Sequence, residues 1–169
     1  MIEILKKQNI QVVMIGSEYD LEFFSINKKE IESLANVTII VAPHSTISIA
    51  NDKWLTTEFL RNNQLPFAEA FLPKDLDDAC KYAEYLGYPV VLKARTGTSS
   101  RNVHIVCDNE NLKQLYPTVP MPMIQRMIDI PSSNLGCEYT CSIFKAANGH
   151  IIGPFTARRT VRGGTSWYI

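Results

Sequence analysis

The sequence has no excess of charge of either sign. Its 169 residues include 17 Lys and Arg and 17 Asp and Glu. A nucleic-acid-binding surface would show a clustered basic excess, and docking to an anionic membrane would need a polybasic segment. The composition therefore argues against nucleic acid and membrane surfaces as partners.

Long apolar runs and a secretory leader are also missing. The longest apolar runs, such as residues 37–42, are far shorter than the ~20 residues of a membrane-spanning helix. Met1 is followed by Glu3 and an amphipathic stretch, which is not the charged, then apolar, then small order of a signal peptide. We therefore expect a cytoplasmic protein without a membrane span.

Paired cysteines are absent as well. The four cysteines form no C-x-x-C pair and have no His at ligand spacing, which argues against a zinc site. In a reducing compartment we expect them to be small buried hydrophobic residues. They are Cys80, Cys107, Cys137 and Cys141.

The first fifty residues show an α/β pattern. Helical spacing over residues 1–9 and 19–34 alternates with the apolar runs 10–15 and 37–42, which predicts two parallel strands joined by a helical crossover. The continuous apolar character of the runs predicts strands buried on both faces. Such a unit normally begins with a strand, so we expect earlier strands of a doubly wound layer to precede Met1.

The rest of the chain predicts helices and antiparallel strands. A helix capped by Asn51 or Asp52 is expected to reach residue 62, a second is expected over 75–86 with a stop at Gly87, and a third begins after Asp108. Extended segments are predicted at residues 89–95, 103–107, 123–128, 137–146 and 150–157. The first two form a hairpin with a polar tip, and Asn148-Gly149 is a strong hairpin signal between the last two.

The strand at residues 89–95 carries an unusual cation. Alternation places Lys93 and Arg95 on the face opposite Leu92 and Ala94. A lysine in so apolar a strand needs an anion or a route to water, and a salt bridge or an edge position would satisfy it equally. The hydroxyl-rich loop that follows, residues 96–101, could clamp a polyphosphate or be an ordinary solvated hairpin tip.

Two further strands carry polar groups that could bind a nucleotide. Glu138 lies on the face opposite Tyr139 and Cys141, where a carboxylate can accept hydrogen bonds from ribose hydroxyls. Alternatively, Glu138 is an acidic surface residue on a half-exposed strand. The extended segment around Gln125 offers backbone groups that can read an adenine edge, or it is a plain core strand.

Four short motifs occur in an order typical of one superfamily. They are Asn51-Asp52-Lys53, Gly87-Tyr88-Pro89-Val90-Val91-Leu92-Lys93, Ile124-Gln125-Arg126-Met127 and Cys137-Glu138-Tyr139-Thr140. By these motifs the sequence resembles the ATP-grasp superfamily, and most closely the ATP-binding domain of the carbamoyl-phosphate synthase large subunit and its relatives. The motifs are specific in this order, although each is short.

The resemblance implies which residues contact ATP. Lys53 and Lys93 would contact the phosphates, and Gln125 and the backbone at Met127 would hold the adenine, while Glu138 would bind the ribose. The other implied nucleotide-binding residues are Thr96, Thr98, Ser99, Ser100 and Arg101 of the closing loop, and Arg126. The implied catalytic cations, facing the phosphate or an acyl-phosphate intermediate, are Arg158, Arg159 and Arg162.

The resemblance also implies Mg²⁺ as a cofactor beside ATP. Its ligands, an acid and then a Glu-x-Asn segment, are expected beyond Ile169, and no metal ligand is predicted within the chain. In-line phosphoryl transfer depends on metal to neutralise developing charge. We therefore expect a fragment, cut at both ends, that binds ATP weakly, if at all, and turns over nothing alone.

The predicted fold class is α/β with an α+β lid. Residues 1–50 would be a partial doubly wound α/β layer, 51–123 a linker helix and the ATP-grasp lid lobe, and 124–169 the adenine-hinge strand and the incomplete start of the large lobe. A core severed in this way would expose apolar surface and favour a homo-oligomer.

The predicted function is that of the ATP-binding part of a ligase. The parent enzyme would activate a carboxylate, bicarbonate or carbamate as an acyl phosphate for attack by an amine, with small-molecule carboxylate and amine substrates. A hypothesis of another class is a non-catalytic α/β nucleotide-binding or interaction module.

Overall fold

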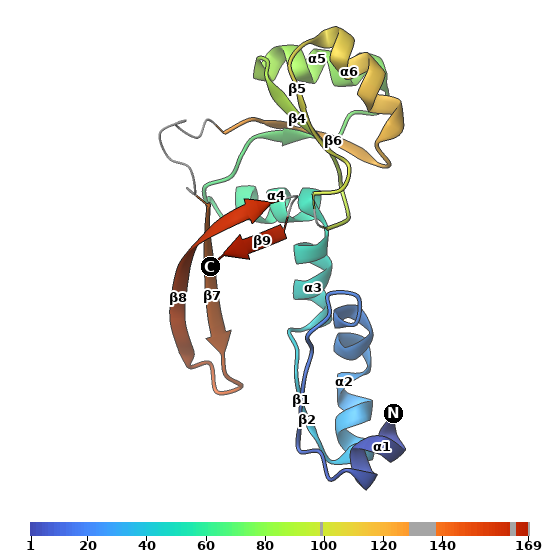
Figure 1. Ribbon diagram of the computed structural model, residues 1–169, viewed down its shortest axis with the longest axis vertical. Helices are drawn as coiled ribbons and strands as arrows, with labels where there is room; N and C mark the ends of the chain where they lie inside the picture. Colours follow the sequence, from blue (N-terminus) through green and yellow to red (C-terminus); the bar gives the residue numbers. More distant parts are fainter. Residues whose placement is uncertain (99, 129–137, 163–164, 169) are drawn as a thin grey trace. The chain divides into compact units, whose positions relative to one another are not determined.

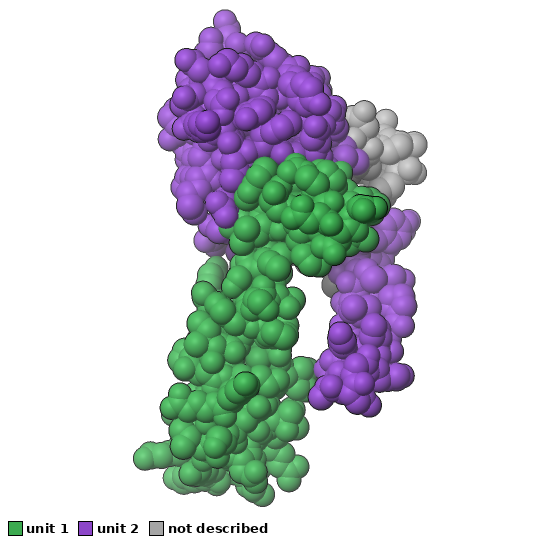
Figure 2. Space-filling view, turned by 180° about the vertical axis from the view of Figure 1, so that it is seen from behind, with its two compact units in different colours: residues 1–67 green, residues 68–169 purple. Residues whose placement is uncertain are grey.

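The computed structural model describes most of the chain. The described residues are 1–98, 100–128, 138–162 and 165–168, with side chains described as far as residue 160. The chain divides into two compact units, unit 1 (Met1–Phe67) and unit 2 (Ala68–Ile169), which Figure 2 shows in different colours. Helices and strands occur in both units, so the predicted α/β class is confirmed.

Unit 1 contains a parallel two-stranded sheet with a helical crossover (Figure 1). Its strands are β1 (Val12–Met14) and β2 (Thr38–Ile40), and helix α2 (Leu21–Ala35) connects them. The predicted parallel crossover is therefore confirmed. The other helices of the unit are α1 (Ile2–Lys7), α3 (His44–Asn51) and α4 (Lys53–Asn62).

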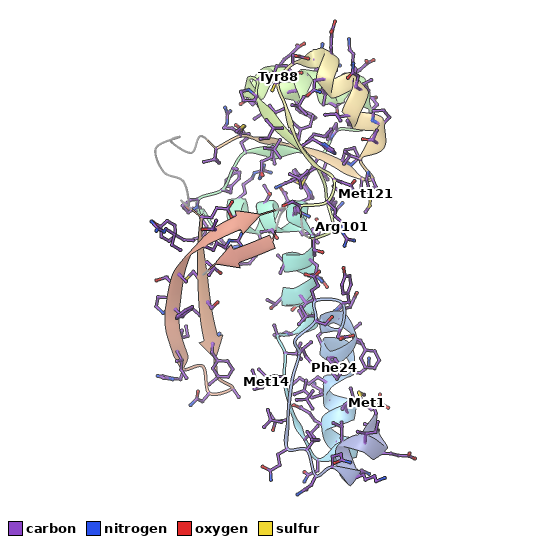
Figure 3. The ribbon with its side chains drawn as sticks, viewed as in Figure 1. Met1, Met14, Phe24, Tyr88, Arg101 and Met121 are labelled. Carbon is purple, nitrogen blue, oxygen red and sulfur yellow. The ribbon has the colours of Figure 1, made fainter. Side chains whose placement is uncertain are left out.

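The prediction that the strands of unit 1 are buried on both faces is wrong. On one face, Ile31 and Ala35 of α2 pack in a core with Ile39. On the other face the side chain of Met14 is 76% exposed, and Figure 3 shows it on the side of the strands away from α2. An apolar run in the sequence does not distinguish a strand covered on one face from a strand covered on two.

Unit 2 begins with a four-stranded antiparallel sheet in the order β3-β6-β4-β5. Its strands are β3 (Ala70–Phe71), β4 (Val90–Ala94), β5 (Val103–Val106) and β6 (Pro122–Arg126). The predicted hairpin of β4 and β5 is confirmed. Helices α5 (Leu76–Leu86) and α6 (Asn109–Leu115) and the 3-10 turn η1 (Tyr116–Thr118) complete this part.

One face of the four-stranded sheet packs against α5 and α6. The buried residues of this core are Ala79, Ala83, Leu86, Val90, Leu92, Ala94, Val106, Leu112, Val119 and Ile124. Full burial of a Leu or Val side chain contributes about 1.5–3 kcal/mol. The opposite face carries Val91 and Lys93 of β4 together with Gln125 of β6, because Val91 and Gln125 lie directly opposite each other.

The last strands form a separate antiparallel sheet in the order β7-β8-β9. They are β7 (Glu138–Lys145), β8 (Ile151–Arg162) and β9 (Thr165–Tyr168). Gly149 in the turn between β7 and β8 has a φ of 84°, and the predicted Asn148-Gly149 hairpin is confirmed. Within the described residues, no helix has the length and apolar character needed to cross a membrane.

The expected burial of the cysteines is wrong for two of them. Cys107 and Cys141 are exposed, and Cys80 is partly buried. Cys107 follows edge strand β5, and Cys141 lies on a strand whose residues are mostly exposed. Cys137 lies outside the described residues.

Candidate functional site

The face of the four-stranded sheet opposite α5 and α6 brings Lys93 and Gln125 together. The Nζ of Lys93 donates a hydrogen bond of 2.7 Å to the Oε1 of Gln125. Both side chains are half-buried. An ammonium group in such a position needs a polar partner, and the amide oxygen supplies one. Two residues predicted separately to contact a nucleotide are therefore neighbours.

The side chain of Gln125 is also fixed at its other end. Its Nε2 donates a hydrogen bond of 3.3 Å to the carbonyl oxygen of Ala68, just before β3. The amide thus links Lys93 on β4 to the segment that precedes β3, across β6. The amino group of Lys93 lies on this face, and such a group can also donate a hydrogen bond to an anion such as a phosphate oxygen.

The loop between β4 and β5 carries the predicted hydroxyl groups. Its exposed predicted site residues are Thr96, Thr98, Ser100 and Arg101. The Arg101 N–H donates to the Thr98 carbonyl at 3.2 Å, and Ser100 and Asn102 have φ values of 55° and 54°. The loop therefore turns through left-handed positions without glycine at either. Ser99 lies outside the described residues.

The loop lies at the end of the sheet where β6 begins. The Arg95 N–H donates to the Met121 carbonyl at 3.1 Å, and the Ala94 N–H donates to the Asn102 carbonyl at 3.0 Å. Figure 3 labels Arg101 and Met121, which lie at this end of unit 2. These backbone bonds fix both ends of the loop to the sheet that carries Lys93.

Lys53 is the first residue of α4 in unit 1. The Asp52 side chain caps this helix by accepting hydrogen bonds from the N–H groups of Trp54 at 2.9 Å and Leu55 at 3.1 Å. Burial lowers the pKa of the Lys53 ammonium, and the negative charge of Asp52 offsets part of that effect. Burial disfavours the charged form of Lys53, and a bound anion would stabilise that form.

Arg126 ends β6 and is held by two other segments of unit 2. Its Nη2 donates to the Glu69 carboxylate at 2.8 Å, and its Nη1 donates to the Leu86 carbonyl at 2.9 Å. The Arg126 backbone N–H donates to the Glu69 carbonyl at 2.8 Å. Met127, the predicted adenine contact, follows directly and is half-buried.

The predicted ribose ligand and one predicted catalytic cation form an ion pair. Glu138 and Arg159 are directly opposite each other on β7 and β8, and Arg159 Nη2 donates to Glu138 Oε2 at 3.1 Å. Arg158 is opposite Tyr139 instead, so it points to the other face of the strand. The structure does not bring Arg158 and Arg159 to one side, and the Arg162 side chain lies outside the described residues.

Two partners of the site, Ala68 and Glu69, were missed by the sequence prediction. They precede β3, a strand of only two residues, which has no periodicity of its own. Residues 67–71 contain one charged residue, Glu69, between two pairs of apolar residues, and so they show no alternation that would predict a strand.

The described residues include no group of three or more His, Cys, Asp and Glu side chains that could hold a metal ion. No step through Mg²⁺ is therefore assigned to this chain.

Part of the chain matches a described protein family. Residues 52–121 match the family "Carbamoyl-phosphate synthase L chain, ATP binding domain". The matched segment includes Lys53, Lys93 and the loop between β4 and β5.

Curated relatives also match part of the chain. The α-aminoadipate–LysW ligase LysX of Saccharolobus solfataricus is 32% identical over 77 residues, which is 46% of this chain and 27% of the relative. The propionyl-CoA carboxylase alpha chain of Rattus norvegicus is 32% identical over 116 residues, which is 66% of this chain and 15% of the relative. The chain thus spans less than a third of these relatives.

Solved structures share the fold. A biotin carboxylase–β-γ-ATP complex from Campylobacter jejuni has a TM-score of 0.73 and 17% identity, covering 89% of this chain and 35% of that chain. A carboxyaminoimidazole ribonucleotide synthase from Aspergillus clavatus, complexed with ATP, has a TM-score of 0.71 and 18% identity, covering 92% of this chain and 39% of that chain.

Proposed function

Because this chain is similar to the ATP-binding domains of ATP-grasp carboxylate–amine ligases, as its motif order predicted, we propose that it is the ATP-binding part of such an enzyme. The observation that carries the proposal is the 2.7 Å contact between Lys93 and Gln125 on one face of the four-stranded sheet. This contact brings together a lysine, which can bind a phosphate group, and a side-chain amide, which can form hydrogen bonds with the edge of a base.

The proposed binding mode assigns each part of ATP to residues of the chain. Lys93 and Lys53 hold phosphate oxygens, and the hydroxyl-bearing loop of residues 96–101 closes over them. Gln125 and the backbone at Met127 hold the adenine. Glu138 is a proposed ribose ligand, and it must then share its carboxylate with Arg159. Arg158, Arg159 and Arg162 remain proposed cations for the phosphoryl group, but Arg158 and Arg159 point to opposite faces of β8, so only one of these two would contact it.

The proposed activity of the whole protein is ligation through an acyl phosphate. A substrate carboxylate oxygen attacks the γ-phosphorus of ATP, the bond to the β,γ-bridging oxygen breaks, and ADP leaves. An amine then attacks the acyl carbon and phosphate leaves. The chain's own share in this scheme is to hold the nucleotide. The division at residues 1–50, 51–123 and 124–169 is proposed on the same basis.

Replacing Lys93 tests the proposal. In a ligand-detected NMR titration with ATP, Lys93→Ala should weaken binding at least about tenfold, because a charge-assisted hydrogen bond to phosphate is lost. Lys113→Ala, an exposed lysine in the last turn of α6, removes the same charge and should bind ATP like the unsubstituted chain. Equal binding by both variants, or no saturable ATP binding by the unsubstituted chain, would contradict the proposal.

A further inference from the structure

The end of β6 is connected to two chain segments that lie far from it in sequence. Arg126 contacts Glu69 through both its guanidinium and its backbone N–H, and it contacts the carbonyl of Leu86 through its other guanidinium nitrogen. Leu86 is the last residue of α5. One arginine thus links β6, the segment before β3 and the end of a core helix.

The two acceptors suit a guanidinium in particular. The carbonyls at the carboxyl end of a helix carry partial negative charge, and the Glu69 carboxylate carries a full one. The planar fork of arginine reaches both acceptors at 2.9 Å and 2.8 Å, whereas the point charge of lysine cannot reproduce both directions. The side chains of Arg126 and Glu69 are 43% and 35% exposed, so the ion pair by itself adds little stability.

The residues on either side of Arg126 are the ones proposed to hold the base. Gln125 precedes it and is bound to the carbonyl of Ala68, and Met127 follows it. Arg126 is bound to Glu69, the next residue after Ala68. The segment of residues 68–69 therefore holds the end of β6 at two consecutive positions.

We propose that Arg126 is a positioning residue for the nucleotide base: by binding Glu69 and the Leu86 carbonyl, its side chain holds Gln125 and the Met127 backbone in place. This rests on the proposed function, and it goes beyond that proposal by giving the side chain a role that needs no contact with ATP. Because the guanidinium is engaged away from the ligand, its loss affects recognition of the base and leaves binding of the phosphates unchanged.

The test compares three ligands: ATP, adenosine and inorganic tripolyphosphate. Arg126→Gln should weaken binding of ATP and adenosine about tenfold, which corresponds to roughly 1.4 kcal/mol, while the affinity for tripolyphosphate stays unchanged. Arg101→Gln makes the same substitution in the loop between β4 and β5. It should weaken binding of ATP and tripolyphosphate and leave adenosine unaffected. Opposite ligand profiles for the two substitutions would support a positioning role.

Two other substitutions keep the proposal testable if Arg126→Gln fails to fold. Glu69→Gln removes one acceptor and should cause a smaller loss with the same ligand profile. Arg126→Lys should recover only part of the ATP affinity. In the double variant of Glu69→Gln and Arg126→Gln, the loss should not exceed that of Arg126→Gln alone, because both substitutions break the same contact.

The outcomes separate this proposal from the proposed function. If the unsubstituted chain binds neither ATP nor adenosine, the proposed function fails. If it binds ATP and Arg126→Gln or Glu69→Gln binds ATP equally well, the positioning role is wrong. A loss of tripolyphosphate affinity equal to the loss for ATP would also overturn it, since that result identifies Arg126 as a phosphate ligand.

Discussion

Lys53 is a charged residue whose partial burial lowers the stability of the folded protein when no ligand is bound. It lies at the start of α4 in a half-buried position, and burial lowers its pKa from the ordinary value of 10.5 despite the nearby carboxylate of Asp52. A bound phosphate would restore the preference for the charged form. Without one, the charge disfavours the folded state.

Lys53→Met should therefore raise the thermal unfolding temperature at neutral pH. Between the lowered pKa and 10.5, the folded protein releases the proton while the unfolded chain keeps it, so the stability of the unsubstituted chain rises with pH in that window. The difference between the two proteins should shrink as pH rises towards 10.5. Calorimetric scans across this pH range measure the difference in unfolding temperature. Lys113→Met is the control for the effect of replacing an exposed lysine by methionine. A lower unfolding temperature for Lys53→Met at neutral pH would contradict the account.

The position of Lys93 followed from the sequence, but its partner did not. Strict alternation places Lys93 on the face opposite Leu92, and the structure confirms this, with Leu92 in the core and Lys93 outside it. The contact with Gln125 depends on the pairing of β4 with β6, which are separated in the sequence by β5, α6 and η1. Local pattern carries no information on such a pairing.

At the scale of elements, the helix starts predicted near residues 52, 75 and 108 agree with the structure. Asp52, Asp75 and Asp108 each precede a helix, and the side chain of each accepts a hydrogen bond from an N–H group in its first turn. A cap is a contact between residues two or three apart. It can therefore be predicted from a short stretch of sequence.

Asp75→Ala tests how much one such cap contributes. The Asp75 carboxylate accepts from the Asp78 N–H at 2.8 Å, and Asp78 in return accepts from the Lys74 N–H at 3.2 Å. Urea unfolding should show a loss of about 1 kcal/mol. Asp77→Ala, on an exposed residue in the same turn, retains the cap and should cost clearly less. An equal loss for both would mean that the cap contributes nothing beyond the first-turn charge.

The elements that the sequence prediction missed are those that depend on distant partners. Strand β3 has two residues and exists through its pairing with β6. Helix α3, which begins directly after Pro43, and strand β9, which follows the Gly163-Gly164 pair, were not predicted either. Strands β3 and β9 have too few residues to show a clear period, so pairing with a neighbouring strand determines them.

At the scale of the molecule, the two lysines proposed to bind phosphate belong to one matched segment of the sequence. Lys53 and Lys93 both lie within residues 52–121. The order of four motifs was sufficient to predict this similarity from the sequence. The identity of the carboxylate and amine substrates could not be predicted in the same way, because the motifs concern the nucleotide alone.

The most direct test of the central claim is an ATP titration followed by amide chemical shifts of the uniformly labelled chain. The account predicts saturable shifts concentrated at Lys93, Gln125, Met127 and the loop of residues 96–102, with smaller changes in the core helices α5 and α6. GTP at the same concentration should shift the loop but not Gln125 and Met127. Shifts confined to β7 and β8, or no saturable change at millimolar ATP, would contradict the assignment of the nucleotide site.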